Sequence, residues 1–174
     1  MSDAFQLEQL LRAYRFNLMY AENLVSDLDS NQMYQSFGNG LENSPAFTLG
    51  HLSTASALIL KYLGAEYPFD ATWDEQFRRK GPGDPRRPEL DPGTGPSKEV
   101  LVTKLQQSHA DVETILKGLP TVRFSEPVEW RFDRFFPTLS DLLTFMCISH
   151  EAMHLAQVAA WRRAAGLESS LGRL

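Results

Sequence analysis

Two histidines near the C-terminal end of the chain have the spacing of a metal-ligand pair. His150 and His154 stand in the segment HEAMH, which has the pattern H-E-x-x-H. On a helix this spacing places two imidazoles one turn apart on the same face, and the glutamate beside them can act as general base. His150 and His154 are therefore candidate metal ligands, and Glu151 is a weak candidate for a catalytic base.

The helix that carries this pair is predicted to turn it toward the protein interior. Burying an imidazole without a partner costs about 1–3 kcal/mol, which a divalent metal ion would remove. The alternative is that one or both are core histidines that donate to backbone carbonyls. We interpret the single cysteine, Cys147, as a small buried hydrophobe rather than a ligand or nucleophile. At about 100° per residue, His150 and His154 lie on the same side of this helix as Leu143, Cys147, Gln157 and Trp161.

A metal site with an open position needs at least three protein ligands, and the chain has two further histidines. His51 is predicted to point inward, because Ala55, Leu58 and Tyr62 continue its helical face. His109 stands among polar residues, and we expect it to face solvent. The predicted ligands are His51, His150 and His154.

A metalloprotease would need its third ligand after the pair. Gln157 and Ala160 stand where the extended zinc-protease pattern has glycine and histidine. Glu168 follows Gly166, where we expect the helix to end, and no edge strand is predicted that could hold a peptide. A protease that uses Glu151 as its base is therefore a remote alternative.

Four amphipathic segments must position these residues, and their apolar spacing predicts four helices. Helix start and stop signals mark the segments, including the capping pair Asn43-Ser44 before Pro45 and the capping box that begins at Thr138. No convincing sheet pattern is present. We expect an all-α four-helix bundle, a fold whose metal sites form between facing helices, with helices at about 4–28, 43–64, 97–119 and 138–165.

The connections differ in length and composition. Residues 29–43 are expected to be a plain connection, and residues 65–97 a long irregular loop with a short helix around TWDEQF. Its aromatic residues favour a loop that packs down over the site. The basic stretch RRKGPGDPRR (78–87) is interpreted as a solvated loop rather than an anion or nucleic-acid patch. The alternation within 122–132 predicts at most a short extended hairpin.

Composition limits the partners. The chain has 174 residues, a net charge of −5 and a pI near 5.4, which is the wrong sign for a nucleic-acid-binding protein. Its length fits a single domain, 1–174. One cysteine, no secretion signal and no run of about 18 apolar residues predict a cytoplasmic protein with no membrane span.

With these residues in hand, the chain resembles the DinB-like (YfiT-like) superfamily of small metal-binding four-helix proteins. The matching segments extend over nearly the whole sequence and occur in the family's order: SPAFTLGHL, WDEQF followed by a Gly- and Pro-rich loop, PSKEVL, FPTLSDLL and HEAMHLAQVAAWRRAAGL. The resemblance implies an up-down-down-up bundle that often forms homodimers. It also implies that His51, His150 and His154 bind a divalent ion, zinc or nickel, and that Gln157 supports them without binding it; Ala156 stands where the family often has glycine.

The resemblance further implies a small-molecule substrate. Relatives include S-transferases and isomerases that depend on low-molecular-weight thiols such as bacillithiol or mycothiol, while many members have no known reaction. The leading hypothesis is a metal-dependent transferase or hydrolase in which the metal lowers the pKa of a bound thiol or water. The alternative is a non-catalytic, dimeric helical module that binds a metal or another ligand.

Overall fold

The computed structural model describes the whole chain except residues 1–2, 39, 80, 82–83 and 85–89. Every regular element in this described part is a helix, which confirms the all-α prediction. The basic residues Lys80, Arg86 and Arg87 of the predicted solvated loop lie outside it.

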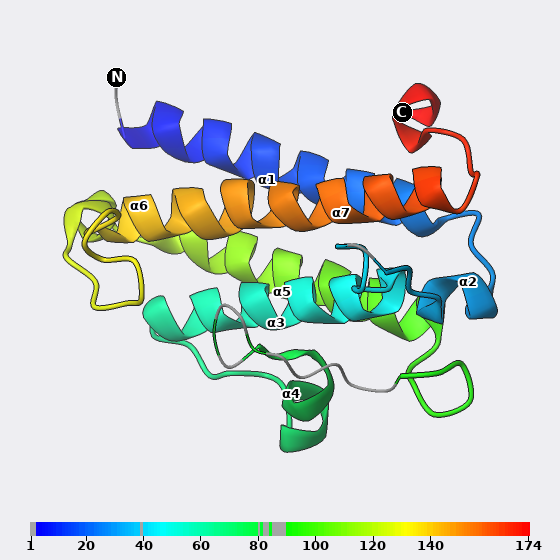
Figure 1. Cartoon of the computed structure of the whole chain (residues 1–174). Helices are drawn as coiled ribbons and strands as arrows, with labels where there is room; N and C mark the ends of the chain where they lie inside the picture. The colour runs from blue at the N-terminus through cyan, green and yellow to red at the C-terminus, as the bar shows by residue number, and fades with distance from the viewer. Residues whose placement is uncertain (1–2, 39, 80, 82–83, 85–89) are drawn as a thin grey trace.

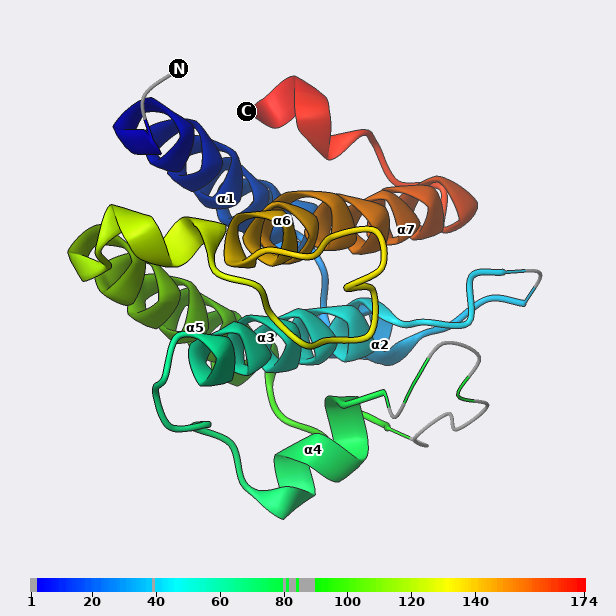
Figure 2. The same ribbon diagram turned by 90° about the vertical axis from the view of Figure 1, so that its left-hand side faces the viewer.

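The long helices lie side by side (Figure 1; Figure 2). They are α1 (Asp3–Val25), α3 (Pro45–Tyr62), α5 (Lys98–Gly118) and a continuous helical run made of α6 (Leu139–Thr144), η2 (Phe145–His150) and α7 (Glu151–Ala164). Helix α3 packs against α5 and α7, and α1 also packs against α5 and α7. The interior is therefore shared by segments from both ends of the chain.

Local signals at the helix ends act as predicted. The Ser44 side chain caps α3, and Thr138 and Asp141 form a capping box at the start of α6. Beyond the ends of α3 and α7, Gly64 and Gly166 have positive φ angles of 86° and 72°, which glycine adopts without steric cost.

The fourth helical run is less regular than its sequence pattern suggests. Residues Phe145–His150 form the π-helical segment η2, and His150 is its last residue. A π segment inserts a wider turn into an α-helix and often occurs at functional sites. Residues on its two sides are consequently not related by a uniform 100° rotation.

Two shorter helices flank the long ones. The expected helix around TWDEQF is α4 (Ala71–Phe77), capped by Asp70. The stretch predicted as a plain connection contains α2 (Ser30–Tyr34), which begins with a capping box formed by Asp29 and Gln32. The stretch does connect α1 to α3, and the sequence pattern did not predict the short helix within it.

The prediction of an extended hairpin within 122–132 is wrong. The connection between α5 and α6 holds the 3-10 helix η1 (Thr121–Ser125) and, among the described residues, a single isolated bridge between Pro127 and Thr138. Its aromatic residues do not alternate between two sheet faces. Instead Trp130, Phe132 and Phe136 gather around Phe145, with ring centroids 5.3–5.6 Å from the Phe145 ring.

Helix α3 is the most buried of the long helices, since 15 of its 18 residues are buried. Together with its neighbours it forms two apolar clusters, one in which Leu52 joins Phe77 and Trp161, and one in which Ile59 joins Tyr14 and Leu143. A residue in the middle of α3 is thus held rigidly in the interior, which matters for His51.

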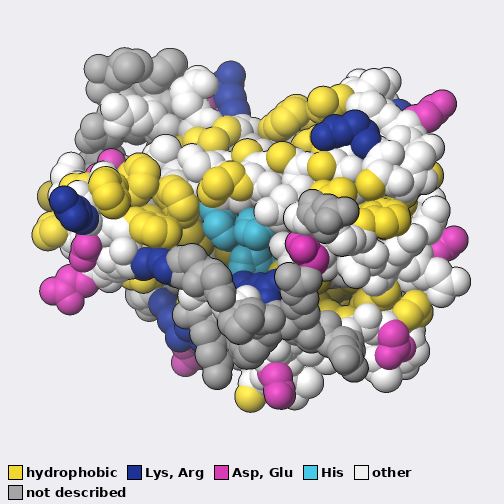
Figure 3. Space-filling view, in the orientation of Figure 1, with side chains coloured by type: hydrophobic (Ala, Val, Ile, Leu, Met, Phe, Trp, Pro, Cys, Tyr) yellow, Lys and Arg dark blue, Asp and Glu magenta, His cyan; other side chains and the backbone are white. Residues whose placement is uncertain are grey.

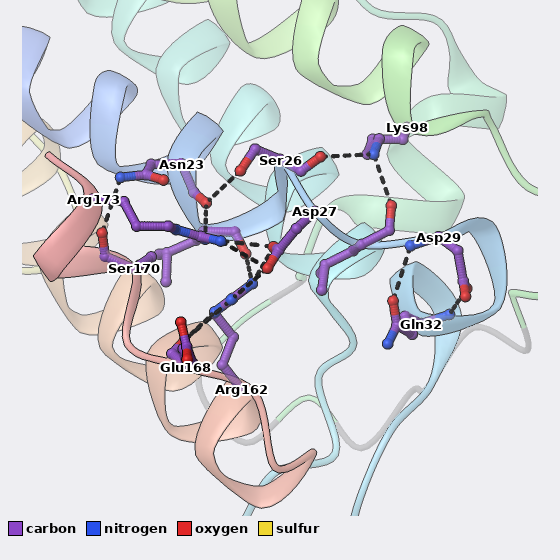
Figure 4. A network of polar contacts seen from close by, with 12 residues as sticks. Asn23, Ser26, Asp27, Asp29, Gln32, Lys98, Arg162, Glu168, Ser170 and Arg173 are labelled. Carbon is purple, nitrogen blue, oxygen red and sulfur yellow. Dashed lines mark hydrogen bonds and ion pairs between the residues drawn. The ribbon is translucent and has the colours of Figure 1, made fainter.

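A buried arginine joins the C-terminal end of α7 to the end of α1 (Figure 4). Arg162 is 1% exposed and donates to both carboxylate oxygens of Asp27, at 2.6 and 2.9 Å. It also donates to the backbone oxygens of Leu24 and Glu168, and Arg173 donates to the same Asp27 carboxylate at 2.7 Å. These bonds satisfy the buried guanidinium.

No helix in the described ranges combines the length and the apolar character that crossing a membrane requires.

Candidate metal centre

The structure brings the three predicted histidines together. His51 comes from the middle of α3, His150 from the end of η2 and His154 from the first turn of α7. Their ring centroids are 4.6–5.4 Å apart, and one nitrogen of each lies within 4.8 Å of the others. The space-filling view shows histidine side chains together in a hollow on this face of the molecule (Figure 3).

A backbone carbonyl fixes the orientation of His51. Its Nδ1 lies 2.9 Å from the carbonyl oxygen of Phe77, the last residue of α4. Because a carbonyl oxygen can only accept, Nδ1 carries the proton and Nε2 keeps its lone pair. A hydrogen bond of this kind sets the tautomer and ring orientation of metal-binding histidines in general.

The residue before His51 allows this contact. A Cβ atom on Gly50 would lie 2.2 Å from the Phe77 ring, so only glycine admits the ring at this place. Phe77 is 0% exposed and packs between α4 and α3. The glycine in SPAFTLGHL was a visible signal for a close approach, but the sequence did not show which residue approaches.

The electrostatics of the site favour neutral imidazoles. Burial lowers the pKa of His51. Burial and the neighbouring histidines lower the pKa of His150 to about 4 and that of His154 to about 3. The Nδ1 atoms of His150 and His154 are buried without a hydrogen-bond partner among the described residues. Three uncharged imidazoles, two of which have an Nδ1 atom without a partner in the described part of the chain, fit a divalent ion such as zinc.

Gln157 lies where the sequence predicts, next to the histidines. A contact with the Gln157 side chain raises the pKa of His154, opposing the larger effect of burial. The Gln157 carbonyl oxygen accepts from the Asn43 amide at 3.2 Å, and the Asn43 oxygen accepts from Arg79 at 3.0 Å. A polar chain therefore connects His154 to the segment that follows α4.

The triad opens into a cavity of about 620 Å³. Such a volume lies within the range of small-molecule sites. Residues from α3, from the end of α4, from the connection before α6 and from η2 and α7 form its walls: Leu58, Ile59, Tyr62, Arg78, Arg79, Gly81, Asp84, Trp130, Arg131, Phe132, Phe145, Met146 and Met153.

The prediction that His109 faces solvent is wrong. His109 is 4% exposed, and its Nε2 lies 2.8 Å from Oε1 of Glu151, which is 2% exposed. His109 follows Leu105 by four residues and precedes Val112 by three, so helical spacing placed it on the buried face of α5. The polar residues beside it in sequence belong to other faces of the helix.

Glu151 is therefore a carboxylate buried between helices, in contact with His109. It belongs to a buried polar cluster, defined here as Tyr14, Ser56, His109 and Glu151, with one residue from each long helical unit. The Tyr14 ring stacks on His109 with centroids 3.7 Å apart, and its hydroxyl donates to Ser56 at 2.9 Å. Burial raises the pKa of Glu151, and His109 opposes that shift. Neither residue lines the cavity above the triad.

Cys147 packs in the apolar interior. It is 0% exposed, and burial raises the pKa of its thiol well above the ordinary value. This placement agrees with the interpretation of Cys147 as a buried hydrophobe, because a neutral, inaccessible thiol is a poor nucleophile and a poor ligand.

The fold and the site together define a small all-helical protein with a three-histidine cluster at the base of a cavity. Comparison with family models identifies it further: the model of the DinB superfamily matches residues 13–158, a range that includes all three histidines. The chain belongs to the DinB superfamily. A search of the curated proteins gave no match.

Proposed function

We propose that His51, His150 and His154 bind a divalent metal ion, zinc or nickel, and that the protein is a metal-dependent enzyme acting on a small molecule. The proposal includes thiol-dependent S-transfer or hydrolysis. The observation that carries it is the junction of the three-histidine cluster with the cavity of about 620 Å³. Three protein ligands leave a coordination position for a reactant, and the cavity supplies space for that reactant.

A divalent ion at this place supplies a Lewis acid that favours the deprotonated form of a thiol near neutral pH. The protein's own residues hold and shield the reactants. The Phe77 carbonyl orients His51, and Gln157 and Asn43 support His154. Trp130, Phe132 and Phe145, which line the cavity, would reduce the access of water to a bound reactant.

Metal analysis of protein purified without a histidine tag tests this proposal. We expect roughly one divalent ion per wild-type chain and loss of the ion in His51→Ala and His154→Ala. The matched control is His109→Gln, which changes a histidine outside the triad and should retain the ion. Wild-type metal content in both triad variants would overturn the proposal.

A non-catalytic metal- or ligand-binding module is the second candidate. It is favoured by the contact between Glu151 and His109, which engages the carboxylate that an H-E-x-x-H enzyme would use as its base. A screen of electrophiles with several thiols, with and without metal, separates the two. Turnover that requires metal and is lost in His154→Ala supports the enzyme. The same contact opposes the protease alternative, because it engages the carboxylate that the protease would need. Casein cleavage by the wild-type protein that is lost in Glu151→Gln would support a protease.

We also infer the family's up-down-down-up arrangement and a homodimer. The ribbon directions support the arrangement, since α1 and α7 run one way and α3 and α5 the other (Figure 1). The dimer is supported by Phe16 and Met19 on α1, each 46% exposed. Exposed apolar side chains that lie close together on one helix can form an interaction surface. Light scattering after size-exclusion chromatography should show a dimer, and Phe16→Glu should convert it to a monomer.

A further inference from the structure

The cavity above the three histidines has two chemically different walls. One wall is aromatic and aliphatic, and the other carries guanidinium groups. In the described part of the chain, the cationic residues of this lining are Arg78 and Arg79, directly after α4, and Arg131 in the connection before α6. The site can therefore distinguish ligands by charge as well as by shape.

Arg79 and Arg78 are held in place by their neighbours. Arg79 lies over the Phe47 ring, 4.4 Å from its centroid, and donates to Asn43 at 3.0 Å. Arg78 pairs with Asp74 at 3.0 Å. Guanidinium groups fixed in this way are organised before a ligand arrives, which lowers the entropic cost of binding an anion.

Arg131 reaches the cavity from the connection before α6, a different segment from the one that carries Arg78 and Arg79. It is exposed, and its guanidinium lies over the face of Phe132, 5.1 Å from the ring centroid. One of its terminal nitrogens lies 3.7 Å from the place that a Cβ atom on residue 81 would occupy. Gly81 also lines the cavity, and it lies between Arg79 and Asp84 in the sequence. The guanidinium-bearing wall is therefore built from two segments, the one that follows α4 and the connection before α6.

The charge of the cavity has the opposite sign to that of the whole chain. Among the described lining residues, three arginines and one aspartate, Asp84, give a formal charge of +2, or +1 when the Asp74 carboxylate that pairs with Arg78 is counted; the whole chain carries −5. A concave site with one sign of charge concentrates ligands of the other sign.

The apolar wall suits a flat, hydrophobic body. Trp130, Phe132 and Phe145 contact one another with ring centroids 5.3–5.6 Å apart. The indole nitrogen of Trp130 donates to the Phe136 carbonyl at 2.6 Å, which fixes the plane of that ring. Rings in such arrangements bind other aromatic or aliphatic groups through offset or edge-to-face contacts.

We propose that the ligand of this cavity is a small organic acid, with a carboxylate held by the arginines and an apolar body packed on Trp130, Phe132 and Phe145. This inference rests on the proposed function, because it names the class of molecule that reaches the three histidines. Guanidinium groups bind carboxylates through paired, charge-assisted hydrogen bonds. The carboxylate belongs either to an electrophilic substrate or to a thiol, and the two sources are separable.

Binding of matched acid and amide probes tests the proposal. Isothermal titration of the full chain compares 3-phenylpropanoate with 3-phenylpropanamide, and 3-mercaptopropanoate with 3-mercaptopropanamide. Each pair differs in charge but hardly in shape. We expect the acid to bind at least about tenfold more tightly than its amide in the pair that resembles the natural ligand. The pair that shows the preference identifies the source of the carboxylate.

The variant Arg131→Gln should reduce that preference by at least about threefold. Arg134→Gln is the control, because it removes an exposed arginine from the same connection that does not line the cavity. Equal affinity of acid and amide, failure of both acids to bind, or the same loss in both variants would overturn the inference.

Metal-free protein separates this inference from the proposed function. If the arginines bind the acid, its preference over the amide persists after the metal has been removed. A preference that appears only in metal-loaded protein means that the carboxylate binds the ion, and it would overturn the inference while leaving metal binding intact. Conversely, if the protein binds no metal, the preference for the acid and its dependence on Arg131 can still be measured.

Discussion

His51 and Phe77 are joined by a hydrogen bond from the imidazole Nδ1 to a backbone carbonyl oxygen 26 positions later in the chain, over 2.9 Å. This bond couples the C-terminal end of α4 to a candidate metal ligand in the middle of α3. The short helix in the long connection therefore has a positioning role.

Gly50→Ala should weaken metal binding through this contact. The added methyl would lie 2.2 Å from the Phe77 ring, so the ring and the carbonyl that orients His51 must move. Loss of such a supporting hydrogen bond typically lowers metal affinity about 10–100-fold. Competition titration with a zinc chelator measures the change.

Gly118→Ala is the matched control, since its added methyl meets no described atom within 4 Å. Alanine favours helix over glycine by about 1 kcal/mol, so helix propensity does not explain a loss at position 50. Wild-type zinc affinity in Gly50→Ala would show that the Phe77 contact does not orient the ligand.

Glu151 and His109 should couple in stability and not in metal binding. Their side chains are 3% and 5% exposed and meet at 2.8 Å, so each change leaves the other partner buried without its contact. A double-mutant cycle with Glu151→Gln and His109→Gln should give a coupling of about 1–3 kcal/mol in the free energy of unfolding. If Glu151→Gln instead lowers zinc affinity without affecting stability, Glu151 belongs to the metal site.

The Asp27 carboxylate should stabilise the protein in a pH-dependent way. Arg162, and after it Arg173, lower the pKa of Asp27 below its ordinary value of 3.8. Since the folded state binds the proton less readily, the stabilisation is present above pH 3.8 and is lost as the pH falls through the lower folded pKa. Asp27→Asn should cost about 1–2 kcal/mol at pH 7, because the carboxylate is partly exposed.

Urea unfolding at pH 7, 4 and 3 measures this effect, and the difference between wild type and Asp27→Asn should shrink toward the acid end. Asp133→Asn, which changes an exposed aspartate, serves as control. A difference that stays constant with pH would mean that the ion pair does not account for the stability.

The Cys147 thiol should be unreactive in the folded protein. It is 0% exposed, and burial raises its pKa, so the reactive thiolate is scarce near neutral pH. Iodoacetamide should label Cys147 in urea but hardly at all in buffer, as mass spectrometry can quantify. Rapid labelling of native protein would show that the thiol is accessible and available for chemistry.

Much of the architecture follows from local sequence patterns. Apolar residues at helical spacing predicted four long helical units, and Ser44, Thr138, Gly64 and Gly166 marked their ends within a few residues. These signals are readable because capping bonds and left-handed glycines depend on neighbours in sequence. The same periodicity turned His51, His150 and His154 inward, where the structure brings them together.

Predictions that treated sequence neighbours as spatial surroundings were wrong. His109 was expected at the surface because polar residues adjoin it, yet residues three and four positions away form its helical face. The π segment η2 also escaped prediction, since a wider turn leaves no trace in a 3.6-residue apolar pattern.

By itself the sequence determined which side chains could serve as ligands and which helix faces they occupy, because periodicity and capping are properties of short segments. Only the tertiary structure decided that the Phe77 carbonyl orients His51, that Glu151 meets His109, and that arginines from two connections face one cavity. These pairings depend on how distant helices pack, and packing follows from the fit of whole surfaces that no single segment encodes.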